Sequence, residues 1–367
     1  MADAASRFSS AFGREHDGVR RARLMTAEGA TLECDREGPH TELFDALPGS
    51  VGVLGALLSV EHTLVDLRHL AASDGSLRVK TVARKHPSAR GLIADLALEL
   101  RAPRSQRCPR AAYGLLIPGG ALLFHSMYTR EPRGRRMLNH RRRDPMRVVV
   151  ERMLHVPMVN RALWSAIFAH YYGDGDCFVD DAEDFAFFMD AGTTTRAYAA
   201  RLGLSSALVQ QVLELPFDAS AAACGAASAL LEGCERLCRA HDVEPVGWDV
   251  LAIRGEASGR SHALRFSMAV ALRSPADDGD ARAFLGAQAS LAADHGARVL
   301  TGKGVYADAD TLAATTRDRL ATLRRLKARW DPTGLFGGPF YRQVLEPAML
   351  RASGAGSELR PSAGEKT

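Results

Sequence analysis

The glycines before residue 56 are the first candidates for ligand binding. Gly49, Gly52 and Gly55 are spaced by three residues, and Ser50 follows the first of them. Glycines at such spacing allow backbone to approach a ligand closely. The apolar residues after Gly55 predict a buried strand that leaves this loop. A tight turn that only preserves a fold remains the alternative explanation of these glycines.

Lys303 is the best candidate for a catalytic side chain. It lies between Gly302 and Gly304, directly after residues 298–301, which are predicted to form a strand. A cation at a strand end can stabilise negative charge that develops on a bound ligand. The alternative is a solvated lysine at the end of a strand.

The glycine loop is the second of three stretches that follow one another along the chain. Phe12-Gly13-Arg14-Glu15-His16-Asp17-Gly18-Val19 comes first, and residues 23–32 then alternate like a hairpin that turns at Glu28-Gly29. The glycine loop itself reads Leu43-Phe44-Asp45-Ala46-Leu47-Pro48-Gly49-Ser50-Val51-Gly52-Val53-Leu54-Gly55. Leu326-Lys327-Ala328-Arg329-Trp330-Asp331-Pro332-Thr333-Gly334-Leu335-Phe336 lies near the end of the sequence. As an ordered set, they resemble the FAD-linked oxidoreductases of the vanillyl-alcohol oxidase type, which carry a PCMH-type FAD-binding domain.

This resemblance implies noncovalently bound FAD and names its contacts. The implied cofactor-binding residues are Ser9, Gly13, Gly49, Ser50, Gly52 and Gly55. It also implies that Lys303 reaches the N1–C2 edge of the flavin, where a cation stabilises the reduced ring. Two positions depart from the pattern, because Leu58 replaces a common threonine and Leu300-Thr301-Gly302 replaces a His-Trp-Gly. The second departure removes a histidine base and disfavours dehydrogenation of a sugar alcohol by that route.

The resemblance also implies a missing part, because Met1 starts after the place of the pyrophosphate-binding half of the FAD domain. Two functions follow as hypotheses. The first is an FAD-dependent oxidoreductase that dehydrogenates an alcohol-like carbon of a small-molecule substrate or reduces an activated double bond. The second is a non-catalytic accessory or binding protein derived from such an enzyme, or one half of a split flavoenzyme that pairs with a separately encoded FAD-binding half.

Composition narrows the class of protein. With 367 residues, 46% hydrophobic and 25% charged, the chain resembles an ordinary globular protein. A net charge of +4 gives no evidence for nucleic-acid binding. The six scattered cysteines are predicted to be reduced thiols in a cytoplasmic protein, and no metal site is expected. The arginine-rich residues 129–147 are expected to be a solvated connector, with docking on an anionic membrane surface as the weaker alternative.

The predicted fold class is α+β. Residues 1–67 are expected to form the C-terminal part of an FAD-binding domain, and residues 68–350 a cap, or substrate-binding, domain with an antiparallel or mixed sheet flanked by helices. Residues 351–367 are expected to be a disordered tail. Within the cap, residues 88–100 and about 310–329 show leucines at helical spacing. Residues 185–190 resemble an aromatic-rich strand of the family.

Overall fold

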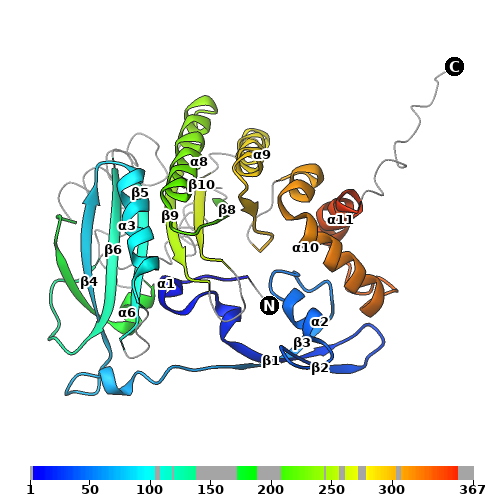
Figure 1. The fold of residues 1–367 in the computed structure, drawn as a ribbon, viewed down its shortest axis with the longest axis horizontal. Helices are drawn as coiled ribbons and strands as arrows, with labels where there is room; N and C mark the ends of the chain where they lie inside the picture. The colour runs from blue at the N-terminus through cyan, green and yellow to red at the C-terminus, as the bar shows by residue number, and fades with distance from the viewer. Residues whose placement is uncertain are drawn as a thin grey trace, which may run out of the picture.

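The structure is a computed structural model that describes residues 3–103, 108–117, 120–137, 172–187, 208–243, 245–255, 261–271, 278–302 and 307–353. Two sheets organise these residues (Figure 1). The smaller has the order β2-β1-β3, and the larger has the order β11-β8-β10-β9-β5-β6-β4-β7. All strand pairings among the described residues are antiparallel. The predicted α+β class is therefore confirmed.

The strands of the two sheets occupy separate parts of the chain. The small sheet consists of β1 (Val19–Met25), β2 (Thr31–Asp35) and β3 (Ala56–His62). The large sheet consists of β4 (Arg78–His86), β5 (Arg110–Ile117), β6 (Gly120–Thr129), β7 (Cys177–Asp181), β8 (Leu208–Pro216), β9 (Pro245–Ile253), β10 (Ala263–Ala271) and β11 (Arg298–Val299).

Helices connect and cover these strands. The α-helices are α1 (Ser9–Phe12), α2 (Thr41–Ala46), α3 (Ala89–Arg101), α6 (Ala182–Phe187), α8 (Ala221–Ala240), α9 (Asp278–Asp294), α10 (Ala309–Trp330) and α11 (Glu346–Ala352). The other helical segments of the described residues are the 3₁₀ helices Glu15–Gly18 and Arg68–Leu70 and the π-helix Tyr341–Leu345.

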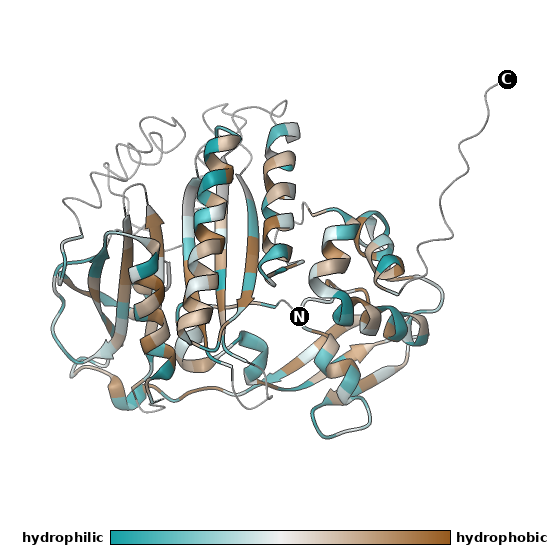
Figure 2. Ribbon diagram, turned by 45° about the horizontal axis from the view of Figure 1, so that its top comes forward, coloured by the Kyte–Doolittle hydropathy of each residue, from teal (hydrophilic) through white to brown (hydrophobic). Residues whose placement is uncertain are grey.

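One face of the large sheet is covered by α3, α8 and α9 (Figure 1). In α3 the predicted leucine spacing is confirmed, because Leu92, Leu96 and Leu100 are all buried. Brown and teal alternate along α3 and α8 in Figure 2, as expected of helices with one apolar side. The same core continues through the leucines of α10 to the inner face of the small sheet, so both sheets share one apolar core.

The opposite face of the large sheet carries a second, aromatic core. Tyr113 and Phe124 stack with their ring centroids 5.1 Å apart, and Tyr172 meets Phe124 edge to face at 5.2 Å. The N-terminal segment reaches this face, where Phe8 stacks on Tyr128 at 5.4 Å. The segment before β1 therefore packs against the large sheet as well as leading into the small one.

Strand β3 corrects the prediction of a buried strand after Gly55. The strand exists, but every residue from Leu57 to His62 is exposed. Even Leu57 and Val60, which pair with the buried Leu24 and Ala22 of β1, are 41% and 46% exposed. β3 is the last strand of its sheet among the described residues, so no neighbouring strand covers its outer edge. An apolar run predicts a strand, but the position in the sheet decides whether the strand is covered.

A second correction concerns residues 185–190. The aromatic residues were expected to lie in a strand, whereas residues 182–187 form helix α6. Acidic residues Glu183 and Asp184 occupy the first turn of this helix, where the helix dipole favours negative charge. Residues 188–190, the greater part of the arginine-rich stretch and residues 354–367 of the expected tail lie outside the described residues.

Candidate functional site

Strand register places three charged residues in one row across the edge of the large sheet. Arg265 of β10 is the direct cross-strand partner of Glu214 of β8, and Arg298 of β11 is the partner of Glu214 on its other side. Side chains alternate along a strand, so Leu213 and Leu215 point into the helix-covered core while Glu214 points to the opposite face. The register therefore creates an arginine–carboxylate–arginine row.

Glu214 is nearly completely buried, with 2% of its surface exposed. Arg14 donates from Nη2 to Oε1 at 2.7 Å, Arg265 donates from Nε to Oε2 at 3.1 Å, and Arg298 donates from Nε to Oε1 at 3.1 Å. Three guanidinium groups thus share one carboxylate. Charge-assisted hydrogen bonds of this kind are stronger than neutral ones, and the buried carboxylate requires them because it has left water.

Asp3 is the second carboxylate of this group. Its Oδ1 lies 3.2 Å from Nη2 of Arg265 and 3.9 Å from Nε of Arg14, and its Oδ2 lies 3.5 Å from Nη2 of Arg298. His16 approaches Oδ1 with Nδ1 at 3.7 Å. We call Asp3, Arg14, Glu214, Arg265 and Arg298 the arginine cluster.

The electrostatics keep both carboxylates charged. Burial raises the pKa of Glu214, but Arg298, Arg265 and Arg14 outweigh burial, so its pKa falls well below the ordinary value. Burial and the charge of Glu214 raise the pKa of Asp3, and Arg265 and Arg298 again lower it overall. The cluster is therefore a network of full charges.

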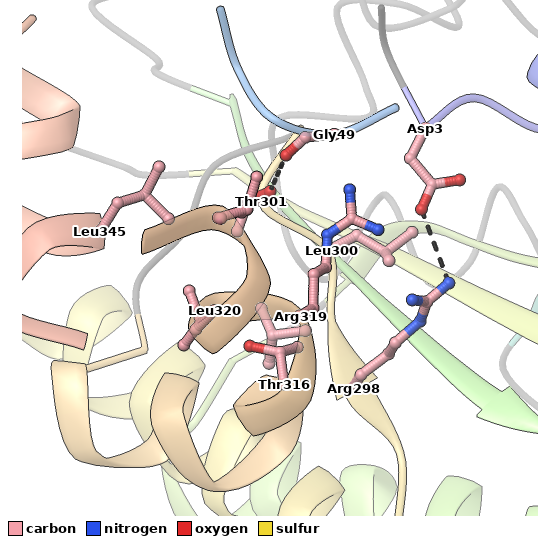
Figure 3. A pocket seen from close by; sticks show the side chains of 11 residues that line it. Asp3, Gly49, Arg298, Leu300, Thr301, Thr316, Arg319, Leu320 and Leu345 are labelled. Carbon is pink, nitrogen blue, oxygen red and sulfur yellow. Dashed lines mark hydrogen bonds and ion pairs between the residues drawn. The ribbon is translucent and has the colours of Figure 1, made fainter. Parts of the chain in front are cut away.

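A pocket connects this cluster with the glycine loop (Figure 3). Asp3 and Arg298 form one side, and Gly49 and Thr301 form another. Thr301 donates a hydrogen bond from Oγ1 to the carbonyl oxygen of Gly49 at 3.1 Å, which is drawn as a dashed line in Figure 3. The remaining lining residues are Val299, Leu300, Thr316, Arg319, Leu320, Leu323 and Leu345.

The pocket is too small for a flavin ring in this conformation. The volume open to the centre of a water molecule is about 20 Å³, which is room for about one water. At Gly49 an added Cβ would lie 3.0 Å from Nη2 of Arg319, so this wall is already in close contact. At Gly52, by contrast, nothing lies within 4 Å of an added Cβ, and its φ is +79°. The glycine loop is therefore open to a ligand at Gly52 and closed at Gly49.

The other glycines and serines predicted to bind the cofactor have different surroundings. Ser50 is buried and donates to the carbonyl of Leu47 at 2.8 Å. Gly55 is packed against β1, since an added Cβ would lie 2.7 Å from the carbonyl oxygen of Met25. The packing therefore explains why position 55 requires glycine.

Ser9 and Gly13 lie apart from the pocket, where α1 packs against β9. The carbonyl oxygen of Ser9 accepts a hydrogen bond from the amide of Arg254 at 3.0 Å. An added Cβ at Gly13 would lie 3.0 Å from the carbonyl oxygen of Arg254. Neither residue lines the pocket, although Arg14, next to Gly13, reaches the arginine cluster.

Lys303 lies outside the described residues, and its predicted role stays a prediction. The structure does describe Thr301 and Gly302, the two residues before it. Because Thr301 is bonded to Gly49, the segment that leads to Lys303 starts at the glycine loop. Thr301, two residues before Lys303 in the sequence, therefore lies beside the glycine loop.

The arginine cluster was missed by sequence reasoning. A signal was present, because Glu214 lies between Leu213 and Leu215, and Arg265 alternates with Leu264 and Phe266. A charged residue at such a position indicates a buried partner on a neighbouring strand. The partner itself depends on strand register, which pairs Glu214 with residues 51 and 84 positions away.

Two arginines in the described part of the arginine-rich stretch form ion pairs with nearby carboxylates. Arg133 lies 2.9 Å from Asp181, and Arg135 lies 2.6 Å from Asp176. Among the described residues, no three His, Cys, Asp or Glu side chains gather as metal ligands would, and no helix has the length and apolarity required to cross a membrane.

Comparison with known proteins places the fold. No protein-family model matches the sequence, and no curated protein matches it. Among solved structures, the chain is similar to the VAO-type flavoprotein MtVAO615 from Myceliophthora thermophila C1, with a TM-score of 0.52 and 15% sequence identity. The two chains share a fold. The match covers 90% of this chain and 58% of that flavoprotein, so this chain spans little more than half of its length.

Proposed function

We propose that this chain is an FAD-dependent oxidoreductase that holds a noncovalent flavin at the glycine loop and acts on a small-molecule substrate. The observation that carries the proposal is the hydrogen bond from Thr301 to Gly49, because it joins the glycine loop to the strand end that precedes Lys303. Two segments that the resemblance assigns to the same cofactor thus meet. The VAO-type fold supports the same assignment.

The described residues could contact FAD on one side only, at the glycine loop. The backbone at Gly52 is open and has positive φ, so a planar or phosphate-bearing group can approach it without meeting a side chain. The closed pocket beside Gly49 does not admit the ring, so binding at the loop requires Gly49 and Arg319 to separate or the ring to lie outside the pocket. When bound, FAD would supply hydride transfer.

The residues of this chain would orient the cofactor and set its surroundings. Thr301 fixes the loop carbonyl, and Arg298 and Arg319 bring positive charge to the side of the pocket. Lys303 would add a cation at the end of the segment that starts at Thr301. Positive charge near a flavin favours its reduced, anionic form. The substrate would be a small molecule that is dehydrogenated at an alcohol-like carbon or reduced at an activated double bond.

Titration of FAD into the purified chain tests this proposal. We expect saturable quenching of flavin fluorescence, and we expect Lys303→Met to lower the reduction potential of the bound flavin while Lys85→Met leaves it unchanged. Lys85 is a suitable control because it lies at the end of β4 in the large sheet. Unquenched FAD at all protein concentrations would count against the oxidoreductase.

A second candidate function is favoured by the exposure of β3. Seven of the nine exposed large apolar side chains in the described residues belong to residues 25–65, namely Met25, Val51, Leu57, Leu58, Val60, Leu64 and Val65. A surface of this kind on an edge strand is typical of a protein interface. The chain would then be one half of a split flavoenzyme, or a non-catalytic binding protein, that docks an FAD-binding half on β3.

The two candidates differ in what the chain does alone. The second candidate predicts that the chain by itself leaves FAD fluorescence unchanged. Quenching should appear only after addition of a protein that supplies the N-terminal half of a VAO-type FAD-binding domain. Quenching by the chain alone would favour the first candidate. No quenching in either mixture would exclude both the enzyme and the split half.

A further inference from the structure

The carboxylate of Asp3 is held by side chains and by few backbone contacts. The main-chain carbonyl oxygen of Asp3 accepts a hydrogen bond from Nη1 of Arg265 at 2.8 Å. The main-chain carbonyl oxygen of Ala4 accepts one from the amide of Glu15 at 3.1 Å. Residues 3–8, the described part of the chain before Ser9, belong to no helix or strand. Asp3 is therefore joined to the cluster mainly by side-chain contacts, and no strand of the sheet depends on its position.

Without Asp3, the arginine cluster has an excess of positive charge. Arg14, Arg265 and Arg298 then face the single carboxylate of Glu214, which leaves two positive charges in a largely buried place. Such an excess is costly in a low-dielectric interior unless an anion compensates it. The cluster therefore requires an anion at the position of Asp3.

Arg14 also offers unused hydrogen-bond donors. Its side chain is 4% exposed, and Nε and Nη1 have no hydrogen-bond partner although they are buried. Nε faces Asp3, whose Oδ1 at 3.9 Å is too distant for a hydrogen bond. An oxyanion with more oxygens than a carboxylate, or a different position, could accept from this group.

We propose that Arg14, Arg265 and Arg298 form a binding site for the oxyanion of a ligand, a phosphate or carboxylate group, and that Asp3 occupies this site as an internal substitute. The guanidinium fork matches both groups by paired hydrogen bonds. The proposal concerns an anion and does not depend on flavin binding.

The position of the site indicates where the rest of an anionic ligand would lie. Asp3 and Arg298 line the same pocket as Gly49 and Thr301 (Figure 3). A ligand with its anionic group on the arginine cluster would therefore extend toward the glycine loop. Departure of Asp3 would also enlarge a pocket that now has room for about one water.

The test uses inorganic phosphate and acetate as probes, with sodium chloride at equal ionic strength as the reference. Asp3→Asn removes the charge of the internal substitute, and Asp3→Ala also removes its volume. Asp45→Ala on the exposed side of α2 is a control with the same loss of charge. Thermal unfolding and calorimetric titration report binding. We expect both Asp3 variants to have a lowered Tm that phosphate restores saturably, with phosphate bound at least about tenfold more tightly than by the wild type. A stronger effect of acetate than of phosphate would assign the site to carboxylates.

A third change identifies the site. Adding Arg298→Gln to Asp3→Ala should abolish the saturable rise in Tm, since Arg298 contributes a donor and is 27% exposed at its side chain. The proposal is wrong if phosphate and chloride act alike on the Asp3 variants, or if Asp45→Ala responds as they do. It is also wrong if the Asp3 variants stay unfolded at every phosphate concentration, because phosphate should then fill the site. None of these readouts involves flavin.

Discussion

Thr301 donates a 3.1 Å hydrogen bond from its Oγ1 to the carbonyl oxygen of Gly49 and so connects two segments 252 residues apart. The donor follows the last strand of the large sheet, and the acceptor begins the glycine loop that leads to the small sheet. Through this bond the loop is fixed relative to the end of β11. Changes at Thr301 should therefore act on both the stability and the ligand-binding properties of the loop.

Thr301→Val removes the donor and keeps the shape of the side chain. We expect a loss of about 1 kcal/mol in the free energy of unfolding, because the carbonyl of Gly49 loses its partner. Thr301→Ser retains the hydroxyl and should remain close to wild type. Urea unfolding followed by circular dichroism measures both variants. Equal stability of Thr301→Val and wild type would show that the bond does not hold the loop.

Gly55→Ala tests the packing of the loop on β1. The new Cβ would lie 2.7 Å from the carbonyl oxygen of Met25, and φ at this position is +152°. We expect a loss of about 2–4 kcal/mol or failure to fold, since backbone must move. Gly29→Ala is the control, because φ is +82° and nothing lies within 4 Å of its added Cβ. It should cost only about 1 kcal/mol, and equal losses at the two positions would contradict the packing described.

Glu214→Gln tests the arginine cluster. Removing the charge leaves three buried or partly buried guanidinium groups with Asp3 as their remaining carboxylate, and we expect a loss of about 3–5 kcal/mol at neutral pH. Urea unfolding at pH 7 measures this change.

The same variant has a predicted pH dependence. Folding lowers the pKa of Glu214 and of Asp3 from the ordinary values of 4.5 and 3.8. The unfolded state therefore binds more protons in this range, so the stabilisation is complete above these values and is lost as pH falls below them. Between about pH 5 and 3 the wild type should lose stability more steeply than Glu214→Gln. Parallel curves would contradict charged carboxylates in the cluster.

The exposed face of β3 predicts a change in surface hydrophobicity. Leu58→Glu with Val60→Glu should reduce binding of the dye ANS and reduce self-association, while the free energy of unfolding changes by about 0.5 kcal/mol or less at each site. Leu98→Glu on α3 is the matched control, because Leu98 is 59% exposed and lies on another element. Equal loss of ANS binding in Leu98→Glu and in the β3 variants would contradict an apolar binding surface at β3.

Local patterns predicted those parts of the fold that depend on neighbours in sequence. The hairpin of β1 and β2 follows from alternation around Glu28-Gly29, and Gly29 indeed has a φ of +82°. The leucines at 312, 320, 323 and 326 predicted the buried side of α10. These features need no information about the rest of the chain.

The remaining features depend on which strands become neighbours. Among the described residues, the sheet order places β3 at an edge, and an apolar run in the sequence does not reveal that order. Likewise, Glu214, Arg265 and Arg298 come together only through the register of three strands. The glycine loop was located from sequence, but the contact that closes it at Gly49 comes from Arg319 on α10.

The most direct test of the proposed function is the affinity of the purified chain for FAD, measured by fluorescence quenching in Gly52→Asn and Gly29→Asn. Both glycines have positive φ, +79° and +82°, and open space at the Cβ position, and asparagine tolerates this backbone conformation. Binding at the glycine loop predicts saturable quenching by the wild type and by Gly29→Asn, and affinity reduced at least about tenfold in Gly52→Asn. No saturable quenching by the wild type, or equal affinity in the two variants, would contradict a flavin site at this loop.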